Sequence, residues 1–320
     1  MKNLFIDTNV FLSFYHFSND DLEELNKLVV LLESKDIILW LPQQVKDEFY
    51  RNRENKISDS MNKIREQKFK PQFPQICKDY EEYSEIRELV DIYKEKLSSL
   101  TDKADADTNS KTLKADLKIK ELFEKAKTID TTQSLVDKAK LRVTIGNPPG
   151  KSGSTGDAIN WEALLENIND DQDLYIVADD QDYYSKLDDT QLKDFLKDEW
   201  TEKKSTDIIF FRRLSQFFKE YYPHIKFAIE LEREHAIKDL VNSATFATTH
   251  RAIAKLKEFS EFTKSEVNEL IQVALTNSQI SSIMGDTDVY DFYTKLYNDN
   301  TALIDKEISE KILERFGTTT

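Results

Sequence analysis

The chain of 320 residues has little of what marks secreted or membrane proteins. Its single cysteine, Cys77, excludes an internal disulfide. No apolar run approaches the roughly 18 residues that a bilayer-spanning helix needs. The first residues, MKNLFIDTNVF, lack the basic region, long apolar run and small-residue cleavage site of a secretory signal. We therefore expect a cytoplasmic protein that does not insert into a membrane.

Histidine and glycine are also scarce. None of the four histidines lies in a Cys/His zinc spacing or in an HExxH pattern, which argues against those zinc sites. Four of the six glycines fall within residues 146–156, GNPPGKSGSTG, which must form an open loop without the order of a phosphate-binding P-loop. Neither DDQDYY nor GDTDVYDF has the glycine and the later glutamate of an EF-hand.

Acidic residues are abundant. The chain carries 60 Asp and Glu residues against 45 Lys and Arg, a formal net charge of -15. Such a charge repels a polyanion at long range and argues against a general nucleic-acid coat protein. A nuclease stays open, because divalent cations bound to a carboxylate site reverse the local sign.

Apolar runs alternate with helical patterns. Residues 3–14, 37–41, 174–178 and 208–211 contain short apolar runs typical of buried strands, and residues 20–34 and 43–65 show helical spacing. Strand, helix, strand is the opening of a parallel α/β sheet. We expect an α/β domain over residues 1–225 with a helical insertion at about 80–142, and an all-helical domain over 230–320.

Acidic side chains recur where these elements end or begin. Asp7 and Asp180 each follow a predicted strand, while Glu48 and Asp157 lie near the starts of helices. Open parallel sheets bind ligands outside the carboxyl ends of their strands, so these acids can converge on one crevice. Hydrolysis of a phosphodiester by two Mg²⁺ or Mn²⁺ ions, about 3.5 to 4 Å apart, requires several carboxylates in one place.

Four motifs resemble a known family. FIDTNVFL around Asp7, VKDEF around Glu48, GDAINWEALL around Asp157 and LYIVADDQDYY around Asp180 are similar to the acidic motifs of PIN-domain nucleases, in the same order. The resemblance covers residues 1 to about 222. GKSGSTGDAINWEALL resembles a long PIN-like bacterial subgroup, found in defence and toxin settings, with a helical insertion and a C-terminal helical extension.

The resemblance implies a three-layer α/β/α fold with a central parallel sheet and a site for Mg²⁺ or Mn²⁺, with two ions expected. It implies that Asp7 bridges both metals, that Glu48 and Asp157 hold one or both, and that Asp180 completes the cluster. Asn9 would orient Asp7. Asp182 is the alternative fourth ligand, and Ala178 stands where many members have Thr or Ser.

The function expected from this resemblance is a metal-dependent endonuclease acting on RNA or single-stranded nucleic acid, as a bacterial toxin or anti-phage effector. Lys151, Arg51 and Arg53 are weaker candidates for contact with substrate, and a solvated helix face is the competing interpretation of the two arginines. A regulatory protein or ligand at the C-terminal domain and a homo-oligomer are further expectations. A single-strand or flap DNA nuclease, and a non-catalytic binding scaffold on the same fold, remain alternatives.

Overall fold

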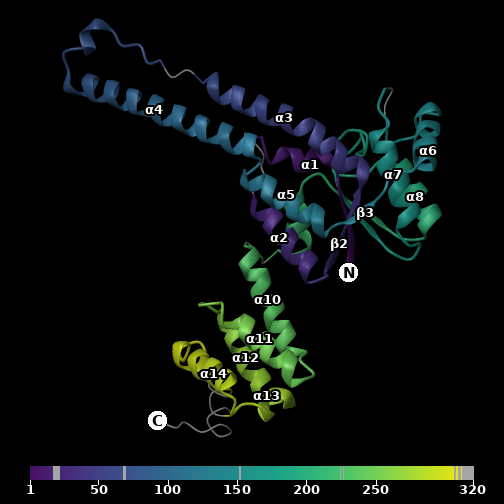
Figure 1. The fold of residues 1–320 in the computed structure, drawn as a ribbon, viewed down its shortest axis with the longest axis vertical. Helices are drawn as coiled ribbons and strands as arrows, with labels where there is room; N and C mark the ends of the chain where they lie inside the picture. The colour runs from purple at the N-terminus through teal and green to yellow at the C-terminus, as the bar shows by residue number, and fades with distance from the viewer. Residues whose placement is uncertain are drawn as a thin grey trace. The chain divides into compact units, whose positions relative to one another are not determined.

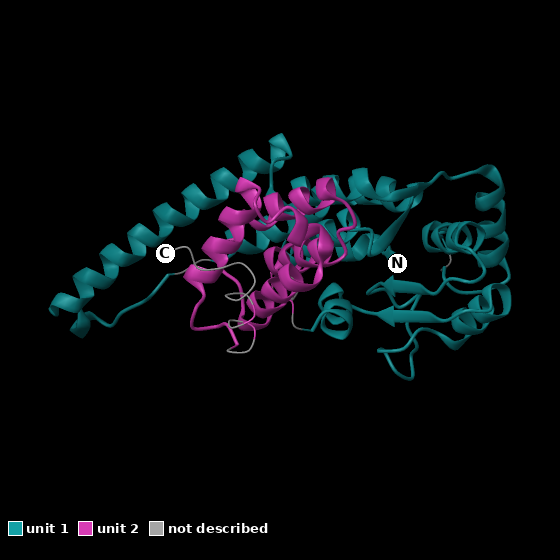
Figure 2. Cartoon of the chain, turned by 90° about the horizontal axis from the view of Figure 1, so that it is seen from below, with its two compact units in different colours: residues 1–224 teal, residues 225–320 magenta. Residues whose placement is uncertain are grey.

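The computed structural model describes residues 1–16, 22–67, 70–150, 153–223, 225, 227–305, 308 and 311. The chain divides into two compact units, Met1–His224 and Ile225–Thr320 (Figure 2). None of the helices in the described part of the chain is both long enough and apolar enough to cross a membrane.

The first unit is built on a five-stranded parallel sheet. Its strands are β1 (Lys2–Ile6), β2 (Ile37–Pro42), β3 (Lys127–Ile129), β4 (Leu174–Val177) and β5 (Ile208–Phe211), in the spatial order β3-β2-β1-β4-β5. The central strand β1 is an apolar run because helices cover both faces of the sheet, and its Leu4, Phe5 and Ile6 are at most 1% exposed. The four runs predicted as strands coincide with β1, β2, β4 and β5.

Helices on both faces complete three layers, which confirms the predicted α/β/α fold. Figure 1 shows α2 (Leu22–Glu33) and α5 (Lys114–Lys125) on one side of the sheet. On the other side lie α6 (Gln133–Thr144), α7 (Gly156–Asn167) and α8 (Asp194–Lys204). The remaining elements of the unit are α1 (Thr8–Ser13), the 3-10 helix η1 (Gln75–Cys77) and α9 (Leu214–Tyr221).

Two long helices, α3 (Gln43–Arg65) and α4 (Glu81–Ser110), form a hairpin that extends from this body (Figure 1). The helical insertion expected at about 80–142 contains one strand besides its helices. Between α5 and α6 the chain contributes the edge strand β3, which pairs with β2 through Trp40 and Lys127. Three residues are too few to show the alternation that identifies a strand.

The second unit is entirely helical in its described residues. It contains α10 (Ala228–Val241), α11 (Phe246–Leu256), α12 (Lys264–Thr276), α13 (Ser278–Ser282) and α14 (Thr287–Asp299). Thr245 caps α11, and Thr263 with Glu266 forms a capping box at the start of α12. The buried faces meet in one core that includes Leu240, Ile253, Leu256, Leu270, Ile271 and Val289.

Candidate active site

Asp7 lies at the point where the strand order changes direction. The chain builds β1, β2 and β3 toward one edge of the sheet and then returns to add β4 and β5 on the other side of β1. Asp7 directly follows β1, and its backbone N–H donates to the carbonyl of Val177 at the end of β4, 2.9 Å away. The crevice outside such a switch point is where open α/β sheets bind ligands.

Asn9 links the first acidic motif to the fourth. Asp7 is the N-cap of α1, and its carboxylate accepts a hydrogen bond from the backbone N–H of Asn9 at 3.3 Å. The side-chain amide of Asn9 donates to Asp180 Oδ2 at 3.4 Å. Asp180 is three residues beyond the end of β4, so Asn9 joins the carboxyl ends of two adjacent strands.

Glu48 and Asp157 come together because α3 and α7 approach closely at Gly156. A Cβ atom on Gly156 would lie 3.3 Å from Glu48 Oε2 and 2.8 Å from Gln44 Nε2. Gln44 is one turn before Glu48 on α3, and its amide donates to Glu48 Oε2 at 3.3 Å. Glycine at this position therefore leaves room for the Glu48 carboxylate beside the first turn of α7, where Asp157 lies.

The acids of this site raise one another's pKa values. Burial, with the charges of Glu48 and Asp180, raises the pKa of Asp7 from 3.8 to about 7, although hydrogen bonds from the backbone of Asn9 and Thr8 oppose this. Burial, with the charges of Asp7, Asp180, Glu48 and Asp182, raises the pKa of Asp157 to about 8. The structure thus brings the sequence-predicted acids into one cluster of like charge.

Asp180 is better placed in this cluster than Asp182. The charge of Asp180 acts on both Asp7 and Asp157, and its carboxylate contacts Asn9. The charge of Asp182 raises the pKa of Asp157, and the backbone N–H of Asp182 donates to Asp180 Oδ1 at 2.9 Å. This geometry favours Asp180 as the fourth acid of the cluster, with Asp182 next to it.

The donors of the cluster fit a hard divalent cation, since all are carboxylate oxygens. Within the described residues, no group of three or more His, Cys, Asp or Glu side chains is arranged so that it could hold a metal ion. Like charges in one site disfavour the ionised forms of its carboxyl groups. The raised pKa values of Asp7 and Asp157 are the electrostatic cost that such a cation would remove.

Tyr183 gives a second, independent indication of a polar ligand. Its side chain is fully buried, and its hydroxyl has no hydrogen-bond partner among the described residues. Burial and the charges of Asp157, Asp7, Asp180 and Glu48 raise its pKa above the usual value of 10. A buried hydroxyl near acids, without a partner among the described residues, is typical of a position that a water molecule or an ion completes.

Lys193 is a cation at this site that the sequence motifs did not indicate. Its ammonium donates to the backbone carbonyl of Asp182 at 2.8 Å, although eleven residues separate the two in sequence. An antiparallel bridge between Tyr184 and Leu192 brings them together. A single bridge leaves too weak a pattern to be found in the sequence.

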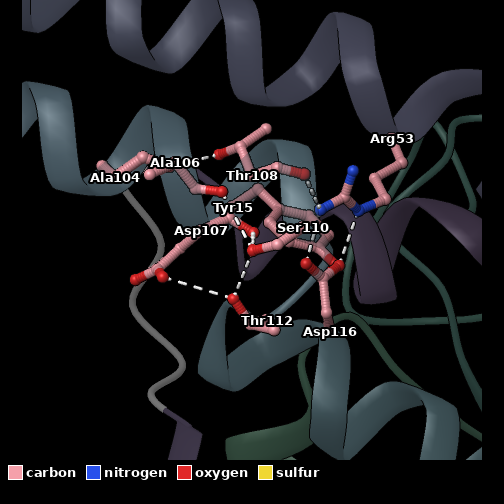
Figure 3. Close-up of polar contacts among 9 residues, drawn as sticks. All are labelled: Tyr15, Arg53, Ala104, Ala106, Asp107, Thr108, Ser110, Thr112 and Asp116. Atoms are coloured by element: carbon pink, nitrogen blue, oxygen red, sulfur yellow. Dashed lines mark hydrogen bonds and ion pairs between the residues drawn. The ribbon is translucent and has the colours of Figure 1, made fainter.

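The basic residues expected to contact substrate are placed differently. Arg51 is exposed on α3, as expected. Arg53 is only 7% exposed and is hydrogen-bonded to Asp116 and to the carbonyl of Thr108, which argues against contact with substrate (Figure 3). The helical spacing alone could not show that α5 supplies a carboxylate to this face of α3. Lys151 lies outside the described residues.

Comparison with known proteins gives one match. A family model described as the PIN domain matches residues 4–183, which is more than half of the chain and includes every acid of the cluster. No curated protein and no solved structure matches the chain.

Proposed function

The chain belongs to the PIN-domain family, whose members are generally nucleases, and from this membership we propose that it is a metal-dependent endonuclease acting on RNA. The observation that carries the proposal is the buried Asp7 beside half-buried acids of like charge, Glu48, Asp157 and Asp180, at the switch point of the sheet. Asp7 and Asp157 are held there with pKa values raised to about 7 and about 8. Perturbed carboxylates in a crevice are typical of catalytic and metal-binding sites.

We assign the following roles to the acids. Asp7 would hold both metal ions, Glu48 and Asp157 would hold one or both, and Asp180 would complete the set, with Asp182 as the alternative. These residues would hold Mg²⁺ or Mn²⁺, which would supply an activated water and stabilise negative charge on the leaving oxygen. Asn9 orients Asp7 and Asp180 through the two hydrogen bonds that it donates to them. Gln44 orients Glu48 in the same way.

The preference for RNA and a role as a toxin or defence effector in the cytoplasm rest on the resemblance to the long PIN-like subgroup. The net charge of -15 supports controlled access, because an acidic protein attracts a polyanion poorly without help. We propose that residues 230–320 form a regulatory domain. Its support is a hydrophobic core of its own, separate from that of the nuclease unit.

The direct test is cleavage of labelled single-stranded RNA and DNA of matched sequence in Mg²⁺, Mn²⁺ or EDTA. We expect RNA to be cut with either metal, no cutting in EDTA, and a loss of at least about 1,000-fold in Asp7→Asn. Glu54→Gln is the matched control, since Glu54 is an exposed acid on the same helix as Glu48. Equal cutting of DNA would show that the substrate is any single-stranded nucleic acid and not RNA in particular. Full activity of Asp7→Asn would refute the assigned site.

A further inference from the structure

A lysine reaches into the acidic cluster from outside the four motifs. Lys193 is the N-cap residue of α8, and its half-buried side chain extends toward the loop that carries Asp180 and Asp182. The charges of Asp182, Asp180 and Asp157 act on its ammonium and oppose the lowering of its pKa by burial. Lys193 therefore lies within electrostatic reach of three acids of the cluster.

The backbone fixes this position. The N–H of Lys193 donates to the carbonyl of Tyr183 at 2.9 Å, and the N–H of Ser185 donates to the carbonyl of Gln191 at 2.8 Å. With the bridge between Tyr184 and Leu192, these contacts close residues 184–192 into a loop whose two ends are paired. The fourth acidic motif and Lys193 are consequently held as one structural piece.

Arg212 braces the same loop from outside. It donates to Asp179 Oδ1 at 2.8 Å, pairs with Asp189 within the loop, and lies over the ring of Tyr184 at 4.6 Å. These contacts satisfy the exposed acids Asp179 and Asp189. Lys193 differs, because the acceptor of its ammonium is a neutral carbonyl. An ammonium has three donors, so this bond leaves capacity for a further acceptor.

We propose that Lys193 is a catalytic residue that binds a non-bridging oxygen of the phosphate to be cleaved. This inference rests on the proposed nuclease function and extends it to a residue outside the acidic motifs. A polyanion must enter a cluster of carboxylates, and a lysine ammonium is a compact charge suited to a phosphate oxygen. A cation fixed before substrate arrives also stabilises charge that develops on the phosphate during attack.

The competing interpretation is that Lys193 only ties the loop to α8 through its bond to Asp182. The two interpretations differ in their effect on nucleic-acid binding. Loss of a phosphate contact lowers the salt dependence of binding, by about 0.7 in the slope of log K against log salt for a single strand. Loss of a purely structural bond lowers thermal stability and leaves that slope unchanged.

The test compares Lys193→Gln and Lys193→Arg with Lys197→Gln in the full chain. Lys197 is exposed one turn further along α8 and gives a control with the same change of charge. Steady-state cleavage of single-stranded RNA is measured in Mg²⁺. Binding of a short labelled RNA is measured in EDTA over a series of salt concentrations, and each variant is melted thermally.

We expect Lys193→Gln to lower kcat about 100-fold and to reduce the salt slope by about 0.7. Lys193→Arg should restore part of both, and Lys197→Gln should stay within about twofold of the wild type in kcat, as a surface change does. Unchanged kcat in Lys193→Gln, or lost activity with an unchanged salt slope, would overturn the proposal. If the wild type cuts nothing, the nuclease function fails separately, and the salt slope alone still decides whether Lys193 contacts phosphate.

Discussion

Two groups of buried charge in the same unit have opposite character. Around Asp116, a carboxylate accepts from Arg53 Nε at 2.6 Å and from the hydroxyl of Tyr15 at 2.5 Å, so that charge and hydrogen bonds are satisfied (Figure 3). Around Asp7, burial and the like charges of Glu48 and Asp180 all raise the pKa of the carboxyl group. The Asp116 group connects α3, α5 and the segment after α1, whereas the Asp7 group collects at the ends of β1 and β4.

The difference separates a structural ion pair from the proposed metal site. A buried carboxylate with a bidentate arginine needs no further ligand. A buried acid beside like charges, without a cation, lowers the stability of the protein, and proteins keep such groups at functional sites. The same residue type, aspartate, therefore has opposite energetic roles at positions 7 and 116, and identical substitutions should have effects of opposite sign.

The largest effect on stability is expected at the Asp116 group, whose charges are paired. Asp116→Asn leaves the buried guanidinium of Arg53 without a counter-charge, and breaking such a pair costs about 3–5 kcal/mol of unfolding free energy. Urea unfolding at neutral pH measures it. Asp59→Asn, an exposed acid on α3, is the control and should stay within about 0.5 kcal/mol of the wild type. A similarly small effect in Asp116→Asn would mean that Asp116 does not stabilise the buried charge of Arg53.

The same substitution at position 7 should stabilise the metal-free protein. An aspartate with a folded pKa of about 7 holds a proton that the unfolded chain releases near pH 3.8, so stability is lost as the pH rises between these values. Asp7→Asn removes this loss. The variant should exceed the wild type by roughly 2–4 kcal/mol at pH 8.5 in EDTA.

At pH 4 the advantage of Asp7→Asn should fall below about 1 kcal/mol, because the folded carboxyl is then protonated and the unfolded one, near its own pKa of 3.8, is partly protonated. The measurement is the difference in urea unfolding free energy between variant and wild type across this range. Groups that titrate alike in both proteins cancel in this difference, so it reports on Asp7 alone. A variant less stable than the wild type at pH 8.5 would contradict the account of the acidic cluster.

A smaller effect is expected where α3 meets α7. Gly156→Ala places a methyl group against the end of the Gln44 side chain, which can move, and beside Glu48 Oε2. Stability should change by less than about 1 kcal/mol, since alanine also favours the helix. Cleavage should fall about threefold to tenfold, because small displacements of catalytic groups are costly. An unchanged rate would show that Gly156 does not set the position of Glu48.

The smallest effect is expected in the second unit. His250 lies against Asp286 at 3.3 Å and Asp288 at 2.7 Å, and the hydrogen bond to Asp288 raises its pKa above 6.5. The contribution of protonated His250 to the free energy of unfolding is therefore fully present below pH 6.5 and is lost as the pH rises through the raised pKa. His250→Gln should reduce stability at pH 6 by less than about 1 kcal/mol, as exposed pairs do. Urea unfolding at pH 6 and at pH 9 measures this effect, and an equal loss of stability at both pH values would contradict it.

The sequence was informative where one element carries a strong pattern. The four longer strands are apolar runs, and Asp7, Glu48, Asp157 and Asp180 stand at fixed places relative to strands and helix starts. Chain order and the rule that ligands lie outside the carboxyl ends of strands then suffice to place these acids near one another.

Features that depend on contacts between distant segments were not predictable. The three residues of β3 are defined by pairing with β2, and the burial of Arg53 depends on Asp116 from another helix. Lys193 reaches the cluster through a single bridge that closes a loop. None of these leaves a periodic signal, since each arises from a tertiary contact rather than from local spacing.

Calorimetric titration of Mn²⁺ into the wild-type chain and Asp7→Asn at pH 7, in two buffers of different ionisation enthalpy, tests directly whether the acidic cluster is a metal centre. We predict that the wild type binds Mn²⁺ and releases protons, because Asp7 and Asp157 are partly protonated without metal. Asp7→Asn should bind at least about tenfold more weakly. Absence of binding in the wild type, or equal binding by the variant, would contradict the claim that this cluster is a metal centre.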